Sequence, residues 1–480
     1  MTTRDDPDGQ RPHPARSLLD RVSELVRSTG TPTQIISIVN HESQLTERHD
    51  RAVIDFCLRA GEAMLAIGAS AADVVAMLLR ISETYGISGM HVDISFTSIT
   101  VSVHRGINEE PTSVMRVVRV RTTDYTRLQN VYRLIEEITE TDKPLDVEVA
   151  RSRLVAILHS PHPYRRWIMT AGQAILAGGV VVMFNVSFVL ILVAAVSAMI
   201  ATGLANRLSK WAVPAFFSQL VAAGFTTAIA VLFFWLRSIG IELPGANHPT
   251  VIVISGIIML LSGIGLTSAA RDAIDGYYVT ASARGLEVIM LTLGLAVGIS
   301  LTLGMALRMG VPISVATTLG PVIEPIPGII GASLIGVGFA LTSYVRLLYV
   351  PLMAAAAGIV FAVYAVVVPS FPQPGLAPAL AGVVAGVIGY LVYRWVKVPE
   401  SAITMAGIIG LIPGLALYRA LYAFMESEYG VEASLPELVL ALSTGVGLAA
   451  GTAIGGFITR SAFGLDRAAR LALRRTRAVR

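Results

Sequence analysis

Residues 255–266 read SGIIMLLSGIGL, and residues 406–417 read AGIIGLIPGLAL. The two stretches align at a shift of 151 residues (406 − 255), and the shift persists further along the chain. A period kept over this many positions predicts that the membrane part consists of two copies of one unit. The glycines paired by this shift are Gly256 with Gly407, Gly263 with Gly414, and Gly294 with Gly445.

Both stretches are apolar, and both carry helix-breaking residues at matched places, Ser262-Gly263 in the first and Pro413-Gly414 in the second. A broken helix leaves backbone polar groups unpaired, which a membrane tolerates only inside protein or beside water. Matched interruptions in two halves indicate the binding site of a transporter. The alternative is that these glycines only let helices pack closely. The candidate substrate-binding residues are Ser255, Gly256, Ser262, Gly263, Gly407, Pro413, Gly414 and Arg419.

The charged residues are unevenly distributed along the chain. Only 15% of the 480 residues are charged and 54% are hydrophobic, whereas soluble domains carry about 25% charged residues. The charges concentrate in residues 1–166, and long apolar runs dominate residues 167–460. The first residues have no apolar signal segment. The single cysteine, Cys57, excludes an intrachain disulfide and a cysteine-based metal cluster, and we expect neither a metal nor another cofactor.

The N-terminal part has the pattern of a small α+β domain. Residues 49–67 follow helical spacing, and Ser70 with Asp73 predicts the start of a second helix. Alternating β-branched residues predict strands over 91–96, 98–104 and 113–121, followed by helices over 124–140 and 145–158. The polar residues Asp93, Thr97 and Ser98 are the candidates for a site in this domain. No nucleophile motif, metalloprotease motif or phosphate-binding loop accompanies them, so a gating or sensing domain is favoured over a membrane-anchored hydrolase.

Ten apolar segments are long enough to span a membrane, since a spanning helix needs about 20 residues. Lys and Arg concentrate in alternate loops, which predicts that both termini lie in the cytoplasm. Five spans per copy would place the second copy upside down relative to the first. The basic tail, 461–480, is expected to be a helix lying on anionic lipid, and basic membrane flanks leave no reason to expect a nucleic-acid partner. The expected spans are 167–184, 186–205, 212–236, 249–269, 285–306, 322–343, 347–368, 376–395, 401–424 and 435–458.

The predicted fold is therefore a polytopic α-helical membrane protein with ten transmembrane helices in two inverted five-helix repeats, preceded by a small α+β cytoplasmic domain. The predicted boundaries are 1–47 for a loosely structured tail, 48–166 for the cytoplasmic domain, 167–309 and 310–460 for the membrane repeats, and 461–480 for the basic tail.

A few ionisable residues lie in or beside the apolar segments. Glu324 is enclosed by prolines and glycines, so burial would raise its pKa into the range of a coupling carboxylate; alternatively it faces water. Asp272 and Asp275 either line an inner vestibule or cap a helix in bulk water, and the second interpretation is favoured. Arg419 lies within a span, where a charge is costly and usually functional, unless its side chain reaches the headgroups.

Five stretches of the chain carry a resemblance to a known family. They are LRAGEAMLAIGASAADVVAMLLRI (58–81), HVDISFTSITVSV (91–103), VMRVVRVR (114–121), SGIIMLLSGIGLTSAARDAIDG (255–276) and AGIIGLIPGLALYRAL (406–421). In their order and spacing they resemble the bacterial threonine/serine exporter family. The resemblance implies ten spans, a cytoplasmic N-terminal domain, and export of threonine and serine driven by the proton motive force in the bacterial inner membrane. One departure is Ser262, where the second copy has Pro413. The oligomeric state stays open, a homodimer included.

Overall fold

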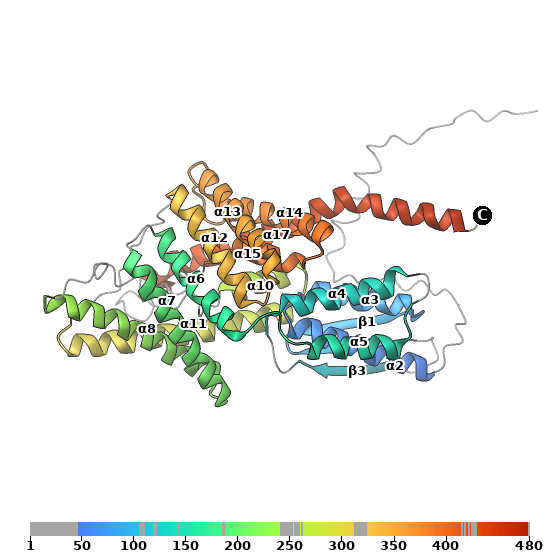
Figure 1. The fold of residues 1–480 in the computed structure, drawn as a ribbon, viewed down its shortest axis with the longest axis horizontal. Coiled ribbons are helices and arrows are strands. Elements are labelled where there is room, and N and C mark those ends of the chain that lie inside the picture. Colours follow the sequence, from blue (N-terminus) through green and yellow to red (C-terminus); the bar gives the residue numbers. More distant parts are fainter. Residues whose placement is uncertain are drawn as a thin grey trace, which may run out of the picture.

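The computed structural model describes residues 47–104, 111–118, 122–141, 144–184, 188–240, 263–311, 324–413 and 430–478, together with positions 253, 260, 416, 419, 420 and 423. An N-terminal unit of helices and strands lies at one end of the molecule, and long apolar helices form the rest (Figure 1). The predicted tail before residue 47 lies outside the described residues.

The N-terminal unit contains one antiparallel sheet and four helices. Its elements are α2 (Glu47–Ala66), α3 (Ala71–Thr84), β1 (Met90–Ser95), β2 (Ser98–Val103), β3 (Thr112–Val117), α4 (Tyr125–Glu140) and α5 (Val147–His159). The sheet has the order β1-β2-β3, and Val92 pairs with Val101, which in turn pairs with Val114. One sheet face packs on α2 and α3, and α4 and α5 cover the other side of these helices.

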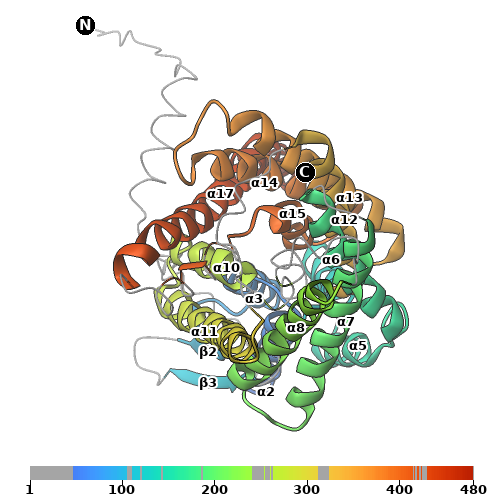
Figure 2. The same ribbon diagram turned by 90° about the vertical axis from the view of Figure 1, so that its left-hand side faces the viewer.

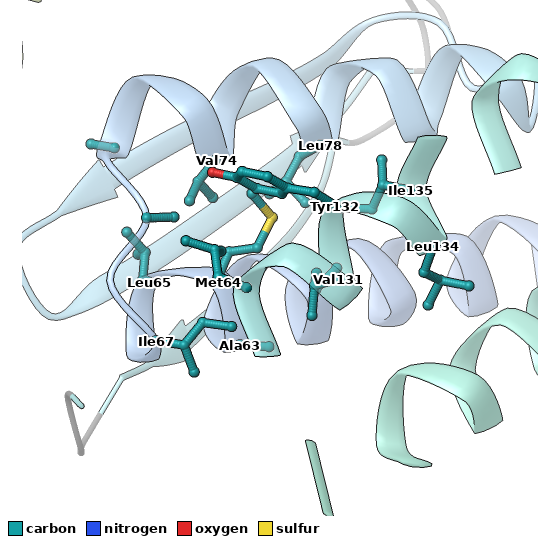
Figure 3. Packing of buried hydrophobic residues seen from close by; sticks show 14 of the residues in the cluster. Ala63, Met64, Leu65, Ile67, Val74, Leu78, Val131, Tyr132, Leu134 and Ile135 are labelled. Atoms are coloured by element: carbon teal, nitrogen blue, oxygen red, sulfur yellow. The ribbon is translucent and has the colours of Figure 1, made fainter. Parts of the chain in front are cut away.

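Local sequence signals explain where these helices begin. The Ser70 hydroxyl accepts a hydrogen bond from the Asp73 N–H (3.1 Å), as the capping pattern predicted, and Asp124 caps α4 in the same way through Arg127 N–H. Such a cap stabilises a helix by about 1 kcal/mol. Met64, Leu78 and Leu128 are fully buried between the helices, and Figure 3 shows Tyr132 of α4 lying across Met64, Val74 and Leu78.

Eight helices are long and apolar enough to cross a membrane within the residues that the structure describes. They agree with eight of the ten expected spans. In the other two places, the described residues form only the short helices α10 and α15, with the 3-10 segment η2 after α15. The bounds are α6 (Arg166–Met183), α7 (Phe188–Lys210), α8 (Ala215–Ser238), α10 (Gly263–Ile274), α11 (Tyr278–Arg308), α12 (Pro325–Thr342), η1 (Leu347–Tyr349), α13 (Val350–Val367), α14 (Leu376–Val396), α15 (Glu400–Ile408), η2 (Ile409–Leu411) and α17 (Gly430–Ala478).

Several described helix pairs approach one another through glycine, and in three of them the contacts show the relative direction of the helices. Gly172 of α6 faces Gly338 of α12, and Gly179 faces Gly331, so that a β-carbon at Gly338 would lie 2.6 Å from the Gly172 carbonyl oxygen. The residue numbers run in opposite directions, so α6 and α12 are antiparallel. The helices are parallel in the pairs α8–α11 and α14–α17, because the numbers of the contacting residues increase together along both helices. Those contacts join Gly294 to Phe216 and Gly298 to Leu220 in the first pair, and Gly447 to Gly375 and Gly451 to Ala379 in the second.

The short helices lie inside the bundle. In the end-on view of Figure 2, α10 and α15 are surrounded by the longer helices. The last helix, α17, continues without a break from its apolar part to Ala478 and extends past the N-terminal unit (Figure 1). At 1.5 Å per residue its 49 residues are about 73 Å long. Residues 461–478 are thus helical and continuous with the apolar part of α17, and the contact of this basic tail with lipid stays a prediction.

Candidate functional site

The two matched stretches meet beside α17. Helix α15 ends at Ile408, η2 follows, and Ile412 is extended before the buried Pro413, so the second stretch is broken where the sequence predicted. In the first stretch, α10 begins at Gly263. A β-carbon at Gly445 of α17 would lie 3.3 Å from Leu266 Cγ and 3.8 Å from Pro413 Cγ. The start of α10 and the break after α15 therefore converge on one place.

The structure describes part of the predicted substrate-binding set. Ser255, Gly256, Ser262 and Gly414 lie outside the described residues. Arg419 is a half-buried helical residue beyond the break. A β-carbon at Gly407 would meet Val360 Cγ2 at 3.2 Å and Ala385 Cβ at 3.4 Å, so this glycine has a packing role. Gly263 is the first residue of α10, where free backbone N–H groups and the helix dipole favour an anion.

Charged side chains gather at the other end of α10 and α15, next to the N-terminal unit. Asp272 is only 2% exposed, and Arg284 Nη1 lies 2.9 Å from its Oδ2. Arg271 Nε lies 3.8 Å from Asp275 Oδ2. The expectation that Asp272 and Asp275 meet bulk water is wrong for Asp272, because the turn from α10 into α11 brings Arg284 over it.

Two further elements contribute to this group of charges. Glu400 begins α15, and its Oε1 lies 2.9 Å from Arg460 Nη2 on α17. Burial raises the pKa of Asp275; the charge of Arg271 opposes the rise, the negative charge of Asp73 on α3 adds to it, and Arg460 opposes it. We call Asp73, Arg271, Asp272, Asp275, Arg284, Glu400 and Arg460 the charge cluster.

Glu324 is placed differently from the expectation. It precedes α12 as the N-cap residue and is exposed, at the end of α12 remote from Ser343 and the N-terminal unit. The interpretation of Glu324 as an enclosed carboxylate is therefore wrong, because the prolines that follow it begin a helix and do not bury it.

The polar residues predicted for the N-terminal unit lie at and beside the β1–β2 turn. Asp93 and Thr97 are exposed, and the Ser98 hydroxyl donates to the Ser95 carbonyl at 3.4 Å. The β1–β2 turn that carries Thr97 contacts α11, where the Thr280 hydroxyl accepts from Phe96 N–H at 3.1 Å. Among the described residues, no three His, Cys, Asp or Glu side chains are placed to hold a metal ion.

Sequence reasoning missed Asp73, Arg284, Glu400, Arg460 and Tyr132 as site residues. The hydroxyl of Tyr132 is buried without a hydrogen-bond partner in the described part of the chain, and burial raises its pKa, with the charges of Asp73 and Glu400 adding to the rise. One available signal was that Arg284 follows Asp272 and Asp275 closely in an otherwise apolar region.

Long apolar helices arranged around two short inner helices, the second of which ends at a break, are the architecture of a polytopic membrane transporter. A family model described as "Putative threonine/serine exporter" matches residues 55–306, and one described as "Threonine/Serine exporter" matches residues 328–458. The chain belongs to the threonine/serine exporter family, whose members are transporters and not enzymes.

Two curated relatives extend along most of the chain. A "Probable threonine/serine exporter" of Mycobacterium tuberculosis is 32% identical over 421 residues, which cover 86% of this chain and 78% of the relative. A "Threonine/serine exporter" of Corynebacterium glutamicum is 29% identical over 425 residues, covering 85% and 82%. No solved structure matches the chain. The chain is accordingly a multi-pass bacterial membrane protein of amino-acid export.

Proposed function

We propose that this protein exports threonine, serine and similar small amino acids from the cytoplasm, and that the proton motive force drives the export. The observation that carries the proposal is the internal arrangement of α10. Its N-terminus meets the broken second stretch, and its C-terminus meets the charge cluster. The names of the relatives supply the substrate class.

The two ends of α10 take different roles in this proposal. Gly263 and Asp272 are nine residues apart, or about 14 Å along a helix, which is longer than a threonine molecule. One substrate therefore cannot contact both ends at once. The α10 N-terminus suits the substrate carboxylate, and the charge cluster suits proton coupling.

The packing of α6 on α12 supports an inverted repeat. Gly331 is the counterpart of Gly172 at a shift of 159 residues (331 − 172), and Gly338 is the counterpart of Gly179 at the same shift (338 − 179). Gly172 faces Gly338 and Gly179 faces Gly331, so each contact joins one glycine to the counterpart of the other. Such a reciprocal contact is the pattern of a two-fold axis. Because the helices are antiparallel, the axis is perpendicular to them and would lie in the membrane plane.

The side on which helices begin and end supports ten crossings. Three long helices, α6, α7 and α8, separate the N-terminal unit from α11, yet α11 begins against that unit at Thr280. Because an even number of crossings is needed to return to that side, we propose one further crossing before α11. In the second half, α15 begins and the apolar part of α17 ends at the Glu400–Arg460 pair, which calls for one more crossing between them.

The orientation follows from the basic loops. The links after α12 and α14 carry Arg346 and Lys397, and both links contact the N-terminal unit. By the positive-inside rule this side is the cytoplasm. We expect a cysteine at position 245 to react with an impermeant thiol reagent from outside the cell, and one at position 397 to react only after permeabilisation. Equal labelling of both positions in intact cells would contradict the inverted arrangement.

Gly263 and Gly414 are expected to keep backbone groups open to the substrate. Replacing either by leucine should reduce threonine export to background while the protein stays inserted and folded. Gly304→Leu is the matched control, because a β-carbon at Gly304 meets nothing within 4 Å. Normal export by both the Gly263 and Gly414 variants would return these glycines to a packing role.

The direct test of the proposed function is export of labelled threonine from loaded vesicles or cells, with and without a protonophore. Export against a gradient that collapses with the protonophore supports the proposal. Export that the protonophore leaves unchanged would support amino-acid export and contradict proton coupling.

A further inference from the structure

Helix α4 of the N-terminal unit lies against the cytoplasmic ends of α12 and α14. The Tyr125 N–H donates to the Ser343 carbonyl at 3.1 Å, and the Thr126 hydroxyl donates to the Tyr344 carbonyl at 2.5 Å. One turn further, the Gln129 side-chain amide donates to the Lys397 carbonyl at 2.7 Å. Successive turns of one helix thus hold the ends of two membrane helices.

A buried carboxylate completes this contact. Glu136 accepts from the Lys397 ammonium at 3.0 Å and from the Tyr393 hydroxyl at 2.7 Å. The Glu136 side chain is 12% exposed and the Lys397 side chain 37% exposed, so water reaches this pair from the Lys397 side. Because Gln129 and Glu136 are seven residues apart, they share one face of α4.

Two of the three residues whose carbonyls α4 holds, Tyr344 and Lys397, have unusual backbone conformations. Tyr344 has φ +53° and Lys397 has φ +60°, and in the described part of the chain Ala212 is the one other non-glycine residue with positive φ. This region is unfavourable for residues with a β-carbon. Strained residues of this kind persist where surrounding contacts hold them, and they are often found at switching elements.

The N-terminal unit also holds the first membrane copy. The Thr280 hydroxyl, near the start of α11, donates to the Ile94 carbonyl at 2.9 Å and accepts from Phe96 N–H at 3.1 Å. One small unit is therefore bonded to α11 in the first copy and to α12 and α14 in the second. If the two copies move against each other during transport, one of these attachments has to open.

We propose that α4 is a releasable clamp: its bonds to Tyr344 and Lys397 hold the second membrane copy to the N-terminal unit, which Thr280 joins to the first copy, and these α4 bonds break in every transport cycle. The proposal rests on the proposed export function. The α4 attachment is the one that opens, because the Lys397 side chain is 37% exposed and water can replace Glu136 beside it, whereas Thr280 is buried. The N-terminal unit is then a moving part of the exporter.

The test joins the two sides of the clamp reversibly. In a Cys57→Ala background, Glu136→Cys and Lys397→Cys are linked with a short bifunctional methanethiosulfonate reagent, and threonine export is measured before linking, after linking and after reduction. We expect linking to reduce export at least tenfold and reduction to restore it. The matched control is Glu137→Cys with Arg153→Cys, a second ion pair (2.7 Å) that lies wholly within the N-terminal unit; linking it should leave export unchanged.

Threonine export by the double-cysteine variants before linking tests the proposed export function alone. Failure of the export function is therefore distinguished from failure of the clamp, which only the linked proteins test. Full export by the linked 136–397 protein would overturn the clamp, and so would equal loss in both linked pairs. A second measurement needs no linking. Gln129 is 2% exposed, so a cysteine there should react slowly with maleimide at rest and several-fold faster when threonine is added. An unchanged rate would also overturn the proposal.

Discussion

Replacing Asp275 by asparagine is expected to abolish threonine export against a gradient while leaving threonine exchange measurable. A coupling carboxylate has to change between protonated and ionised forms as access switches sides. Burial raises the pKa of Asp275, while the positive charges of Arg271 and Arg460 lower it. A small movement of either arginine would therefore change the pKa of Asp275. Asparagine keeps the size of the side chain and removes the titration.

The size of the effect follows from the membrane potential. One charge crossing 100 mV contributes about 2.3 kcal/mol, which at about 1.36 kcal/mol per tenfold sustains a gradient of about fiftyfold. The Asp275→Asn variant should reach a threonine ratio near one in energised vesicles, whereas the parent protein should approach the larger value.

Glu324→Gln is the matched control for this prediction. Glu324 is exposed at the far end of α12, so the change should leave the threonine gradient intact. The opposite pattern, with coupling lost in Glu324→Gln and kept in Asp275→Asn, would move the coupling role to the end of α12 that carries Glu324. Asp272 is less suited, because it is already paired with Arg284, whose Nη1 lies 2.9 Å from its Oδ2.

The sequence predicted those features that depend on local patterns. The Ser70 cap, the three strands and eight spans follow from residue spacing, and the break at Pro413 follows from proline itself. The candidate site was predicted less well, because its charges come together from α3, α10, α11, α15 and α17. Burial of Asp272 depends on where the turn before α11 directs Arg284, which no local pattern encodes.

The relation between the two halves was also only partly visible in the sequence. The shift of 151 residues pairs Gly294 with Gly445, but the glycine with the same packing role is Gly447, at a shift of 153 (447 − 294). In the α6–α12 pair the shift is 159. Links of unequal length change the shift along the chain, so one fixed period misses the contact that relates the halves most directly.

Gly338→Ala is expected to prevent stable folding, although it adds a single methyl group. The new β-carbon would lie 2.5 Å from Leu176 Cβ and 2.6 Å from the Gly172 carbonyl oxygen. A side chain could turn away, but a backbone carbonyl on a packed helix cannot, so α6 and α12 would have to separate. Overpacking of this kind costs about 3 kcal/mol. We expect a large drop in the Tm of the purified protein in detergent, and loss of folded protein from membranes.

The same substitution at Gly304 of α11 is the control. A β-carbon there meets nothing within 4 Å, and alanine favours a helix over glycine by up to about 1 kcal/mol, so the Tm of Gly304→Ala should stay level or rise. Gly179→Ala should behave like Gly338→Ala, because its β-carbon would lie 2.8 Å from the Gly331 carbonyl oxygen in the other half of the reciprocal contact. If Gly179→Ala and Gly338→Ala have the same Tm as the parent protein, α6 and α12 are not in contact through glycine. The two-fold relation proposed from that contact would then be contradicted as well.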